Sequence, residues 1–394
     1  MSSAWRATAF GASLYLLVGA NLPYLPVWLE TNRGFTGAQI SAMIAAGTLI
    51  RIFAGPIMAA RAEQNGLRQV LTQTSLLCLL AFAALAPAAT PLFAVIGCVT
   101  ISYVAWGLLM PLADAALLSF TKDQRPDYGA GRAIASACFI VASLSVGALL
   151  RMYGPDAAIW WLVGASALMV VTGAALPKEE VSQASARQPL GETLRQGFRL
   201  YRDPRIFFAG MAACLIQAAH AYYYNLGSNI WIGQGIGEEY LGALWSTGVV
   251  VEILFLLVSG FMFVRISPGA LILIGGLGAV VRWTFTGFAP PLGILFGLQT
   301  LHALSFAATH IGILRLLAEE LPEDKVPVAL AINSAVMFGP MLALLGMVSG
   351  IYYDTYRDAQ ARGYWLMAAV AAFGCLCALK VVRRVQPQSA VSAG

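Results

Sequence analysis

The sequence predicts an all-α polytopic membrane protein with twelve transmembrane helices, arranged as two six-helix bundles with pseudo-two-fold symmetry. Three observations predict this class. Of 394 residues, 59% are hydrophobic and only 11% are charged, with a mean hydropathy of +0.74, whereas an ordinary globular domain carries about 25% charged residues. Apolar runs recur along the chain, and each reaches the roughly 20 residues that a membrane-spanning helix needs. One long polar stretch, residues 177–203, divides these runs into two equal sets.

The spans follow one another with short connections, because twelve such helices use about 240 to 300 residues. Before the polar stretch, apolar runs predict spans at 7–29, 36–60, 69–87, 91–120, 130–151 and 157–176. After it, they predict spans at 204–232, 238–264, 267–289, 291–317, 326–352 and 362–382. In the eleventh span, the Gly339-Pro340 pair predicts a kink. The chain therefore divides into an N-terminal bundle (1–176), a cytoplasmic linker (177–203) and a C-terminal bundle (204–394).

Charged loop residues predict the orientation of the chain in the membrane. Lysine and arginine concentrate on the side that carries both termini and the linker, and the loops of the other side have only Arg33, Arg151, Arg357 and Arg362. Because basic loops stay in the cytoplasm, we expect a multi-pass protein of the bacterial inner membrane with both termini cytoplasmic. The net charge of +5 then reflects this topology in a lipid bilayer, and it indicates no nucleic-acid partner.

The sequence carries no signature of a pump or an enzyme. It has no Walker A motif, no HExxH and no GxSxG. We therefore expect no catalytic residues, no metal site and no cofactor, with the proton gradient as the energy source. All the cysteines fall within predicted spans, so we expect no disulfide; they are Cys78, Cys98, Cys138, Cys214, Cys375 and Cys377.

Two stretches resemble the major facilitator superfamily. GANLPYLPVWLE at 19–30 is similar to the first helix of its lactose permease group. AARAEQNGLRQVL at 59–71 resembles the superfamily's signature between spans two and three, with Glu63 where aspartate is usual, and with matching Gly66 and Arg68. Ala59 replaces the leading glycine of that signature.

Four further stretches resemble the 3-phenylpropionate permease branch of this superfamily: DYGAGRAIAS (127–136), CLIQAAHAYYYNLGSNIW (214–231), LWSTGVVVEIL (244–254) and LQTLHALSFAATH (298–310). Together the resemblances cover nearly the whole chain. They imply the major facilitator fold and a proton symporter that works by alternating access.

Asp114 and Arg132 stand in apolar segments, where a charge costs about 2.5 to 3.5 kcal/mol at the bilayer centre unless it meets water or a partner. A short cytoplasmic turn separates them, so two antiparallel helices bring both side chains to a similar depth. The resemblance implies that they contact the substrate, as the carboxylate and arginine of helices four and five do in lactose permease-like proteins. A structural ion pair at the cytoplasmic mouth is the alternative.

The C-terminal half carries a second set of ionisable residues. Glu252, Arg282 and His302 match the polar network of the lactose permease group, but Ser305 stands where that group has its proton-carrying glutamate. The phenylpropionate branch carries a second histidine instead, matched by His310, about 80° around the helix from the first. Histidine titrates near neutral pH, so we expect Glu252 and the two histidines to carry the proton and Arg282 to tune them. Interhelical hydrogen bonding is the alternative role for a histidine.

Polar and aromatic side chains on three spans are candidates for substrate contact. Span seven has a stripe at spacings of three and four, which fits either a cavity lining or a packing surface; it comprises Gln217, His220, Tyr224, Ser228 and Trp231. Asn21 and Tyr24 on span one and Trp245 on span eight are further candidates. Arg51 on span two is interpreted as a structural salt-bridge partner or, alternatively, as a contact for an anionic substrate.

These features predict that a proton and a small organic solute cross the membrane together, carried by a monomer. The resemblance implies an aromatic acid such as a phenylpropionate, because arginine binds carboxylates and aromatic walls stack on rings. An ionised Asp114 would repel an anion unless it is paired with Arg132, so a sugar or nucleoside proton symporter is the second hypothesis. A drug/proton antiporter is less favoured, because that group typically has a Gly-Pro motif on span five and span five of this chain contains no proline. A non-transporting membrane receptor is a further alternative.

Overall fold

The computed structural model describes residues 2–121, 125–178, 190–262, 265–323 and 325–382. Its elements are α1 (Ser3–Arg33), α2 (Gly37–Asn65), α3 (Leu67–Leu85), α4 (Leu92–Thr121), α5 (Tyr128–Tyr153), α6 (Ala157–Ala174), α7 (Leu190–Leu200), α8 (Pro204–Ala218), α9 (Ala221–Gly233), α10 (Glu238–Met262), α11 (Pro268–Thr286), α12 (Leu292–Thr300), η1 (Ala303–Ala308), α13 (Thr309–Glu320), α14 (Val326–Ile332), η2 (Asn333–Phe338), α15 (Gly339–Thr355), η3 (Arg357–Arg362) and α16 (Gly363–Leu379). Within the described residues, twelve helices are long and apolar enough to cross a membrane. This confirms the predicted fold class.

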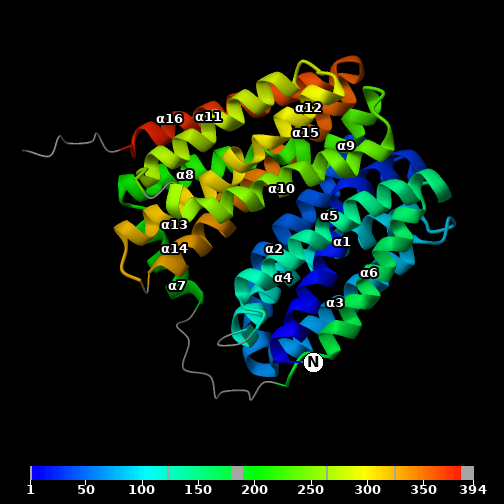
Figure 1. Cartoon of the computed structure of the whole chain (residues 1–394), viewed down its shortest axis with the longest axis horizontal. Helices are drawn as coiled ribbons and strands as arrows, with labels where there is room; N and C mark the ends of the chain where they lie inside the picture. The colour runs from blue at the N-terminus through cyan, green and yellow to red at the C-terminus, as the bar shows by residue number, and fades with distance from the viewer. Residues whose placement is uncertain (1, 122–124, 179–189, 263–264, 324, 383–394) are drawn as a thin grey trace, which may run out of the picture.

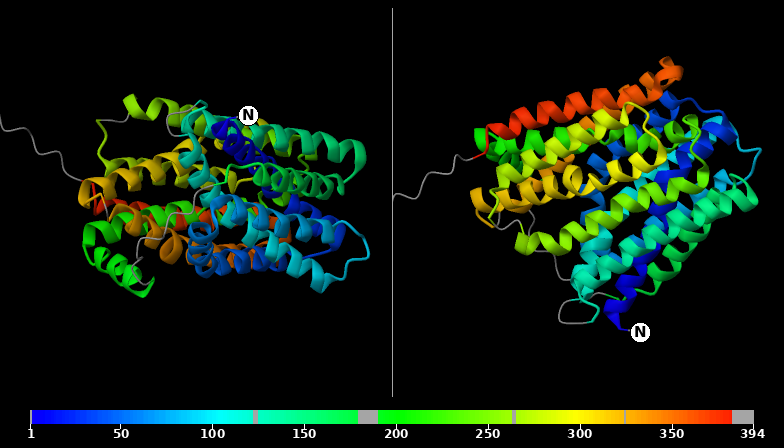
Figure 2. Two further views of the ribbon diagram at one scale, coloured as in Figure 1. Left: turned by 90° about the horizontal axis from the view of Figure 1, so that it is seen from below. Right: turned by 45° about the horizontal axis from the view of Figure 1, so that its top comes forward.

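The helices form two bundles, one from α1–α6 and the other from α8–α16 (Figure 1). In Figure 1 the bundles meet near α5 and α9 and diverge toward the end that holds the N-terminus and α7. The right-hand view of Figure 2 shows the same divergence. Contacts between the bundles run through α2 with α15, α5 with α10, and α1 with α9.

Local sequence signals set several helix ends. Thr36 and Gln39 form a reciprocal capping box at the start of α2, as expected for this pair at the first turn of a helix. Gly34 ends α1 at φ 67°, and Gly66 is the single residue between α2 and α3, at φ 82°. A side chain at either position would be strained, because positive φ is readily open only to glycine. The positive φ at position 66 thus explains why the 59–71 stretch has a glycine there.

The joined end of the bundles is held by backbone contact and by a helix cap. Asp354 of α15 accepts hydrogen bonds from the first two backbone N–H groups of α2, those of Gly37 and Ala38, both at 2.8 Å. These N–H groups have no partner inside their own helix, and a carboxylate there also interacts favourably with the helix dipole. A Cβ at Gly350 would lie 2.5 Å from the Gly37 carbonyl oxygen, so α2 and α15 are in close backbone contact.

A second set of contacts joins the bundles at the same end. Glu30, near the end of α1, accepts a hydrogen bond from the Tyr353 hydroxyl of α15 at 3.0 Å. It also accepts one from the Asn229 side chain of α9 at 2.5 Å, and Asn229 further donates to the Pro26 carbonyl. The described contacts between bundles therefore include two polar clusters at the end away from the N-terminus.

Three of the spans depart from regular α-helix at their middle. Span seven is interrupted between α8 and α9 at His220, whose ring Nδ1 lies 3.0 Å from the Gln217 carbonyl. Span ten contains the π-helical segment η1, directly after His302, and span eleven contains η2, directly before Gly339 and Pro340. The sequence predicts a kink at Gly339-Pro340, and the π-helical segment directly before this pair fits the N–H that proline lacks. The other two were not foreseen, and π-helical turns often mark functional sites.

The linker contains a helix that the sequence analysis treated as polar connection. α7 lies against α14: a Cβ at Gly197 would meet Ile332 and Val328, and the Tyr201 hydroxyl donates to the Ala329 carbonyl at 2.9 Å. Residues 179–189 of the predicted linker lie outside the described residues. The described part of the linker therefore belongs with the C-terminal bundle.

Candidate functional site

The centre of the C-terminal bundle is a buried arginine. Arg282 of α11 is 0% exposed. Its Nη1 donates to His302 Nδ1 at 2.9 Å and to the Ser305 hydroxyl at 3.3 Å, and its Nη2 donates to Gln299 Oε1 at 2.6 Å. The guanidinium also lies over the Trp283 ring at 4.4 Å, a favourable cation–π contact. Neutral acceptors and aromatic faces thus hold this cation, and among the described residues no carboxylate pairs with it directly.

His302 links this arginine to Glu252. An arginine N–H can only donate, so His302 Nδ1 accepts and the ring carries its proton on Nε2. That nitrogen lies 3.5 Å from Glu252 Oε2 of α10. A second proton on His302 would set an N–H group against the guanidinium and break the Arg282 contact. The geometry therefore favours a neutral His302 between a fixed cation and a carboxyl group.

His220 extends the chain through Ser305. The Gln217 carbonyl can only accept, so His220 Nδ1 donates to it and Nε2 accepts from the Ser305 hydroxyl at 3.1 Å. Ser305 in turn accepts from Arg282. Polar groups on α10, α11, span ten and the α8–α9 break therefore form one continuous network. We name its members, Glu252, His302, Arg282, Ser305 and His220, the histidine network.

Aromatic rings enclose the network on one side. Tyr223 stacks on Trp245 with ring centroids 4.2 Å apart, and its hydroxyl accepts from the Gln299 amide at 3.1 Å. Trp245 donates its indole N–H to the Ser228 hydroxyl at 3.0 Å. Tyr224 stacks on His220 at 5.5 Å. Three of the predicted substrate contacts, His220, Tyr224 and Trp245, are thus brought together at the network.

His310 lies at the edge of this arrangement. The rings of His302, Phe306 and His310 form a parallel stack, with centroid distances of 5.3 and 6.3 Å. His310 is exposed, whereas His302 is buried. Glu252 interacts electrostatically with His310 and also with Arg132 of the other bundle. The two histidines therefore lie on one side of span ten, with His310 nearer to solvent.

Asp114 and Arg132 form a close pair in the N-terminal bundle. Arg132 Nη1 lies 2.7 Å from Asp114 Oδ1, and the two side chains are 34% and 39% exposed. The Arg132 guanidinium also stacks over Tyr15 at 5.2 Å. Asp114 lies seven residues before the end of α4 and Arg132 four residues after the start of α5, and Tyr15 interacts electrostatically with this pair and with Glu252. The predicted pairing is present, and Arg132 lies within electrostatic reach of Glu252 of the histidine network.

The remaining predicted contacts lie outside the histidine network. Tyr24 is fully buried, and its hydroxyl donates to the Ser143 carbonyl of α5 at 2.7 Å, so its observed contact is a helix-packing bond. Gln217 takes part through its backbone carbonyl. Asn21 is fully buried in the N-terminal bundle, beside the Tyr103 hydroxyl of α4.

Sequence reasoning missed three members of the site. Ser305 was noted only as a departure from the lactose permease pattern, yet it connects Arg282 to His220. Gln299 stands three residues before His302, a helical spacing that places two polar groups on one face, and this was the signal available. Tyr223 offered no signal, because it is one of three consecutive tyrosines.

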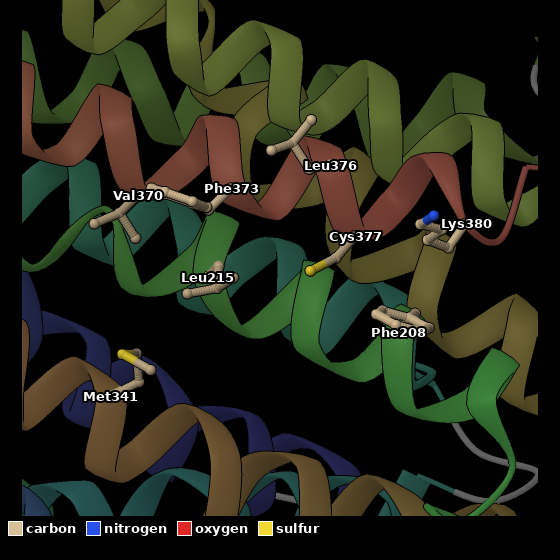
Figure 3. A pocket seen from close by; sticks show the side chains of 8 residues that line it. All are labelled: Phe208, Leu215, Met341, Val370, Phe373, Leu376, Cys377 and Lys380. Atoms are coloured by element: carbon tan, nitrogen blue, oxygen red, sulfur yellow. The ribbon is translucent and has the colours of Figure 1, made fainter.

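Two apolar hollows lie elsewhere on the molecule. Figure 3 shows one of about 450 Å³ between α8, α15 and α16. Its lining is apolar apart from Lys380 at one end, and Phe373 and Leu376 are more than half exposed. A second, of about 530 Å³, lies beside α5 and α6 and includes Trp160 and Trp161. Exposed apolar side chains of this kind suit contact with lipid tails, and neither hollow includes a member of the histidine network.

Comparisons with known proteins agree with this architecture. The chain matches the MFS_1 like family over residues 9–362. It is 29% identical, over 94% of this chain and 95% of the relative, to a protein from Escherichia coli (strain K12) described as a probable 3-phenylpropionic acid transporter. It is 25% identical to a maltose permease from Geobacillus stearothermophilus, over 96% of this chain and 93% of that protein.

Among solved structures, a variant of the nucleoside transporter NupG superposes with a TM-score of 0.81 at 16% identity, covering 97% of this chain and all of that one. At that identity the likeness concerns the fold. The family match covers most of the chain, and the relatives are transporters rather than enzymes. This protein therefore belongs to the MFS_1 like family and is a multi-pass membrane transporter.

Proposed function

We propose that the protein is a proton-coupled symporter that imports a small organic acid by alternating access, with an aromatic acid such as a phenylpropionate as the substrate class. The observation that carries the proposal is the contact of Glu252 with a neutral His302 that Arg282 holds in place. Because Arg282 occupies His302 Nδ1, the network takes up a proton on Glu252 without losing a hydrogen bond. His310, exposed and electrostatically coupled to Glu252, is the proposed route between Glu252 and solvent.

The substrate class follows from the surroundings of the network and from the Escherichia coli relative. Tyr223, Tyr224 and Trp245 offer stacked aromatic faces, which suit an aromatic ring. Asp114 does not repel an anion when it is neutralised by Arg132, and we propose this pair as a polar substrate contact. We also propose Asn21, Tyr24 and Gln217 as substrate contacts, but with weaker support than the Asp114–Arg132 pair. The hydrogen bonds described for Tyr24 and Gln217 are to other parts of the protein.

A sugar or nucleoside symporter is the second candidate. The Asp114–Arg132 pair presents both acceptors and donors, which suits hydroxyl groups, and the maltose permease relative points the same way. The two candidates differ in the charge that moves. One proton with one carboxylate is electroneutral, whereas one proton with a neutral sugar carries net positive charge.

We propose that the structure is in the inward-facing conformation, which is open to the cytoplasm. The loop charges favour a cytoplasmic location for both termini and the linker, in the inner membrane of a bacterium. The bundles diverge toward the end that holds the N-terminus (Figure 1). The Asp354 and Glu30 clusters then close the opposite side. We propose that a single chain is sufficient for transport, because each bundle supplies its own polar groups.

Transport into proteoliposomes tests the function. When the outside is more acidic than the inside, we expect 3-phenylpropionate to accumulate inside and to carry protons with it. A radiolabel measures the accumulated acid, and an internal pH dye measures the protons. Each pH unit corresponds to about 1.36 kcal/mol, so two units sustain about a hundredfold accumulation at one proton per acid. A potassium–valinomycin potential should add little. Accumulation of maltose or a nucleoside that responds to the potential would favour the second candidate, and no solute-linked proton uptake would refute symport.

Replacing Asp354 with alanine should loosen the closed end. Loss of a helix cap costs about 0.5–2 kcal/mol, so the ratio of inward- to outward-facing molecules should fall by about 2- to 30-fold. Spin labels on the exposed ends of α2 and α15, read by pulsed electron spin resonance, would report longer distances at that end. Asp358→Ala, in the neighbouring 3₁₀ segment, is the matched control. An unchanged distance distribution in Asp354→Ala would contradict the assignment.

A further inference from the structure

A second polar cluster lies in the N-terminal bundle, at the middle of its helices. Arg51 is the central residue of α2, with fourteen residues on either side. Its guanidinium lies 5.7 Å from the Trp106 ring, and Trp106 lies 5.7 Å from the Tyr103 ring, both near the middle of α4. Asn21 of α1 is adjacent to the Tyr103 hydroxyl. We name these four residues the Arg51 cluster.

Some polar atoms of this cluster lack partners. Arg51 Nη2 donates to the Thr48 hydroxyl at 3.1 Å, but its Nε has no acceptor. The Trp106 indole nitrogen also lacks a hydrogen bond, whereas the Tyr103 hydroxyl and the Asn21 amide interact with each other. Tyr103 is 3% exposed and Asn21 0%. Buried polar groups in native proteins are nearly always paired, so the Arg51 and Trp106 donors that lack an acceptor point to a ligand with acceptor atoms.

The unpaired atoms define the chemistry of that ligand. Arginine and the tryptophan indole supply only N–H donors, and the tyrosine hydroxyl and the asparagine amide add further donors. No acidic side chain pairs with Arg51 among the described residues, so its positive charge is not balanced locally. A carboxylate satisfies both needs, because it accepts several hydrogen bonds and pairs in bidentate fashion with arginine.

The backbone is shaped to hold Arg51 in this position. A Cβ at Gly107 of α4 would overlap the Arg51 guanidinium, so the glycine provides the space in which the side chain lies. A Cβ at Gly47 of α2 would lie 2.7 Å from the Tyr103 Cβ, which brings the two helices close. The next residue of α2, Ile52, lies against Gly339 of α15. The Arg51 cluster therefore adjoins the boundary between the bundles, at mid-membrane depth, where transporters of this architecture bind their substrates.

We propose that the Arg51 cluster binds the carboxylate of the transported acid. This assignment deepens the symport function proposed above and rests on it. It separates two roles: Arg51 balances the substrate's charge, while Arg132 is already neutralised by Asp114. The sequence suggested either a structural salt bridge or an anionic-substrate contact for Arg51. Among the described residues no acidic side chain forms that salt bridge, so we favour the substrate contact.

Ligand protection on the wild-type protein is the first test. Phenylglyoxal modifies accessible arginines, and residue-resolved mass spectrometry measures the rate at each one. We expect 3-phenylpropionate to slow modification of Arg51 at least about tenfold, and its neutral amide, 3-phenylpropanamide, to have no such effect. Arg151, exposed at the end of α5, serves as the internal control. Equal modification of Arg51 with and without a bound acid would overturn the proposal.

Affinity measurements on variants form the second test. Arg51→Gln should weaken binding of the acid by about 10- to 100-fold, as expected for a lost charged hydrogen bond, and should remove the preference for acid over amide. Arg51→Lys should restore part of that preference, and Gly107→Ala, which displaces Arg51, should resemble Arg51→Gln. Arg151→Gln should bind as wild type.

The outcomes separate this proposal from the proposed function. Wild-type affinity and acid preference in Arg51→Gln, with symport intact, would overturn the subsite alone. If the wild-type protein binds no member of a panel of aromatic monocarboxylates, the proposed substrate class and the subsite both fall. Where Arg51→Gln does not yield folded protein, the lysine variant and the protection measurement decide.

Discussion

Glu252→Gln is expected to abolish proton-driven accumulation of the substrate while leaving substrate exchange across the membrane. Glutamine has the shape of a protonated glutamate and its amide oxygen still faces His302, whose Nε2 lies 3.5 Å from the carboxylate in the wild type. It cannot gain or lose a proton in the physiological range. The carrier should therefore complete the substrate half of its cycle with no proton bound or released.

Two assays on the same proteoliposomes measure this separation. Under a two-unit pH gradient, accumulation should fall from about a hundredfold to about onefold, since each unit supplies about 1.36 kcal/mol. Counterflow, in which internal unlabelled substrate exchanges with external label, should persist within a few-fold of wild type. Glu239→Gln, on the exposed start of α10, should keep both activities. Accumulation that survives in Glu252→Gln would place the proton site elsewhere.

Arg282→Gln should abolish every mode of transport, counterflow included, and should lower stability as well. The guanidinium donates hydrogen bonds to three acceptors, which belong to His302, Ser305 and Gln299. An acceptor left unpaired in a buried site costs about 1–3 kcal/mol, so the free energy of unfolding should fall by roughly 2–5 kcal/mol after partial rearrangement. His302 would also be free to take either tautomer, which removes the fixed geometry toward Glu252.

Thermal unfolding in detergent and counterflow together report both effects. Arg151→Gln is the control for loss of an arginine at an exposed position, and it should change neither. Arg282→Lys should keep the charge but lose the simultaneous contacts to Gln299 and His302, because lysine lacks the planar fork of donors; we expect partial stability and little transport. Arg282→Gln with wild-type counterflow would show that the network is structural only.

The pairing of Asp114 with Arg132 could be predicted because it is nearly local. One short turn joins their helices, and helical geometry places the two side chains at a similar depth. What this reasoning did not give was the electrostatic interaction of Arg132 with Glu252 of the other bundle. That interaction depends on how α5 packs against α10 of the other bundle, which no local sequence pattern encodes.

The histidine network was only half predictable. The individual residues Glu252, Arg282, His302 and His220 stood out as charges and polar groups in apolar runs, and a polar residue in a span is costly enough to be noticed. Their connection through Ser305 was not predictable, because a serine in a transmembrane helix is common and costs little. The break at His220 was equally hidden, since neither proline nor glycine stands there.

Tyr24 and Asn21 also show that the sequence does not reveal the contacts of a buried polar residue. Both are polar residues on one span and are equivalent in the sequence, yet Tyr24 donates to a backbone carbonyl of α5, while Asn21 interacts with the Tyr103 hydroxyl of α4. Arg51 was interpreted chiefly as a structural residue, and the structure gives it no acidic partner among the described residues. Only the neighbours that packing supplies distinguish a packing contact from an unpaired group that calls for a ligand.

By itself, the sequence determined that this chain crosses a membrane twelve times, in two sets of six, with its charges outside the lipid or in a few exceptional positions. The free energy of placing a residue in hydrocarbon depends little on residues far away in the chain. The length and hydropathy of each apolar run are therefore enough to predict a membrane span. Only the tertiary structure decided which of the exceptional residues meet. Groups on α10, α11, span ten and the α8–α9 break converge through helix packing between residues far apart in the chain, and no local pattern encodes that packing.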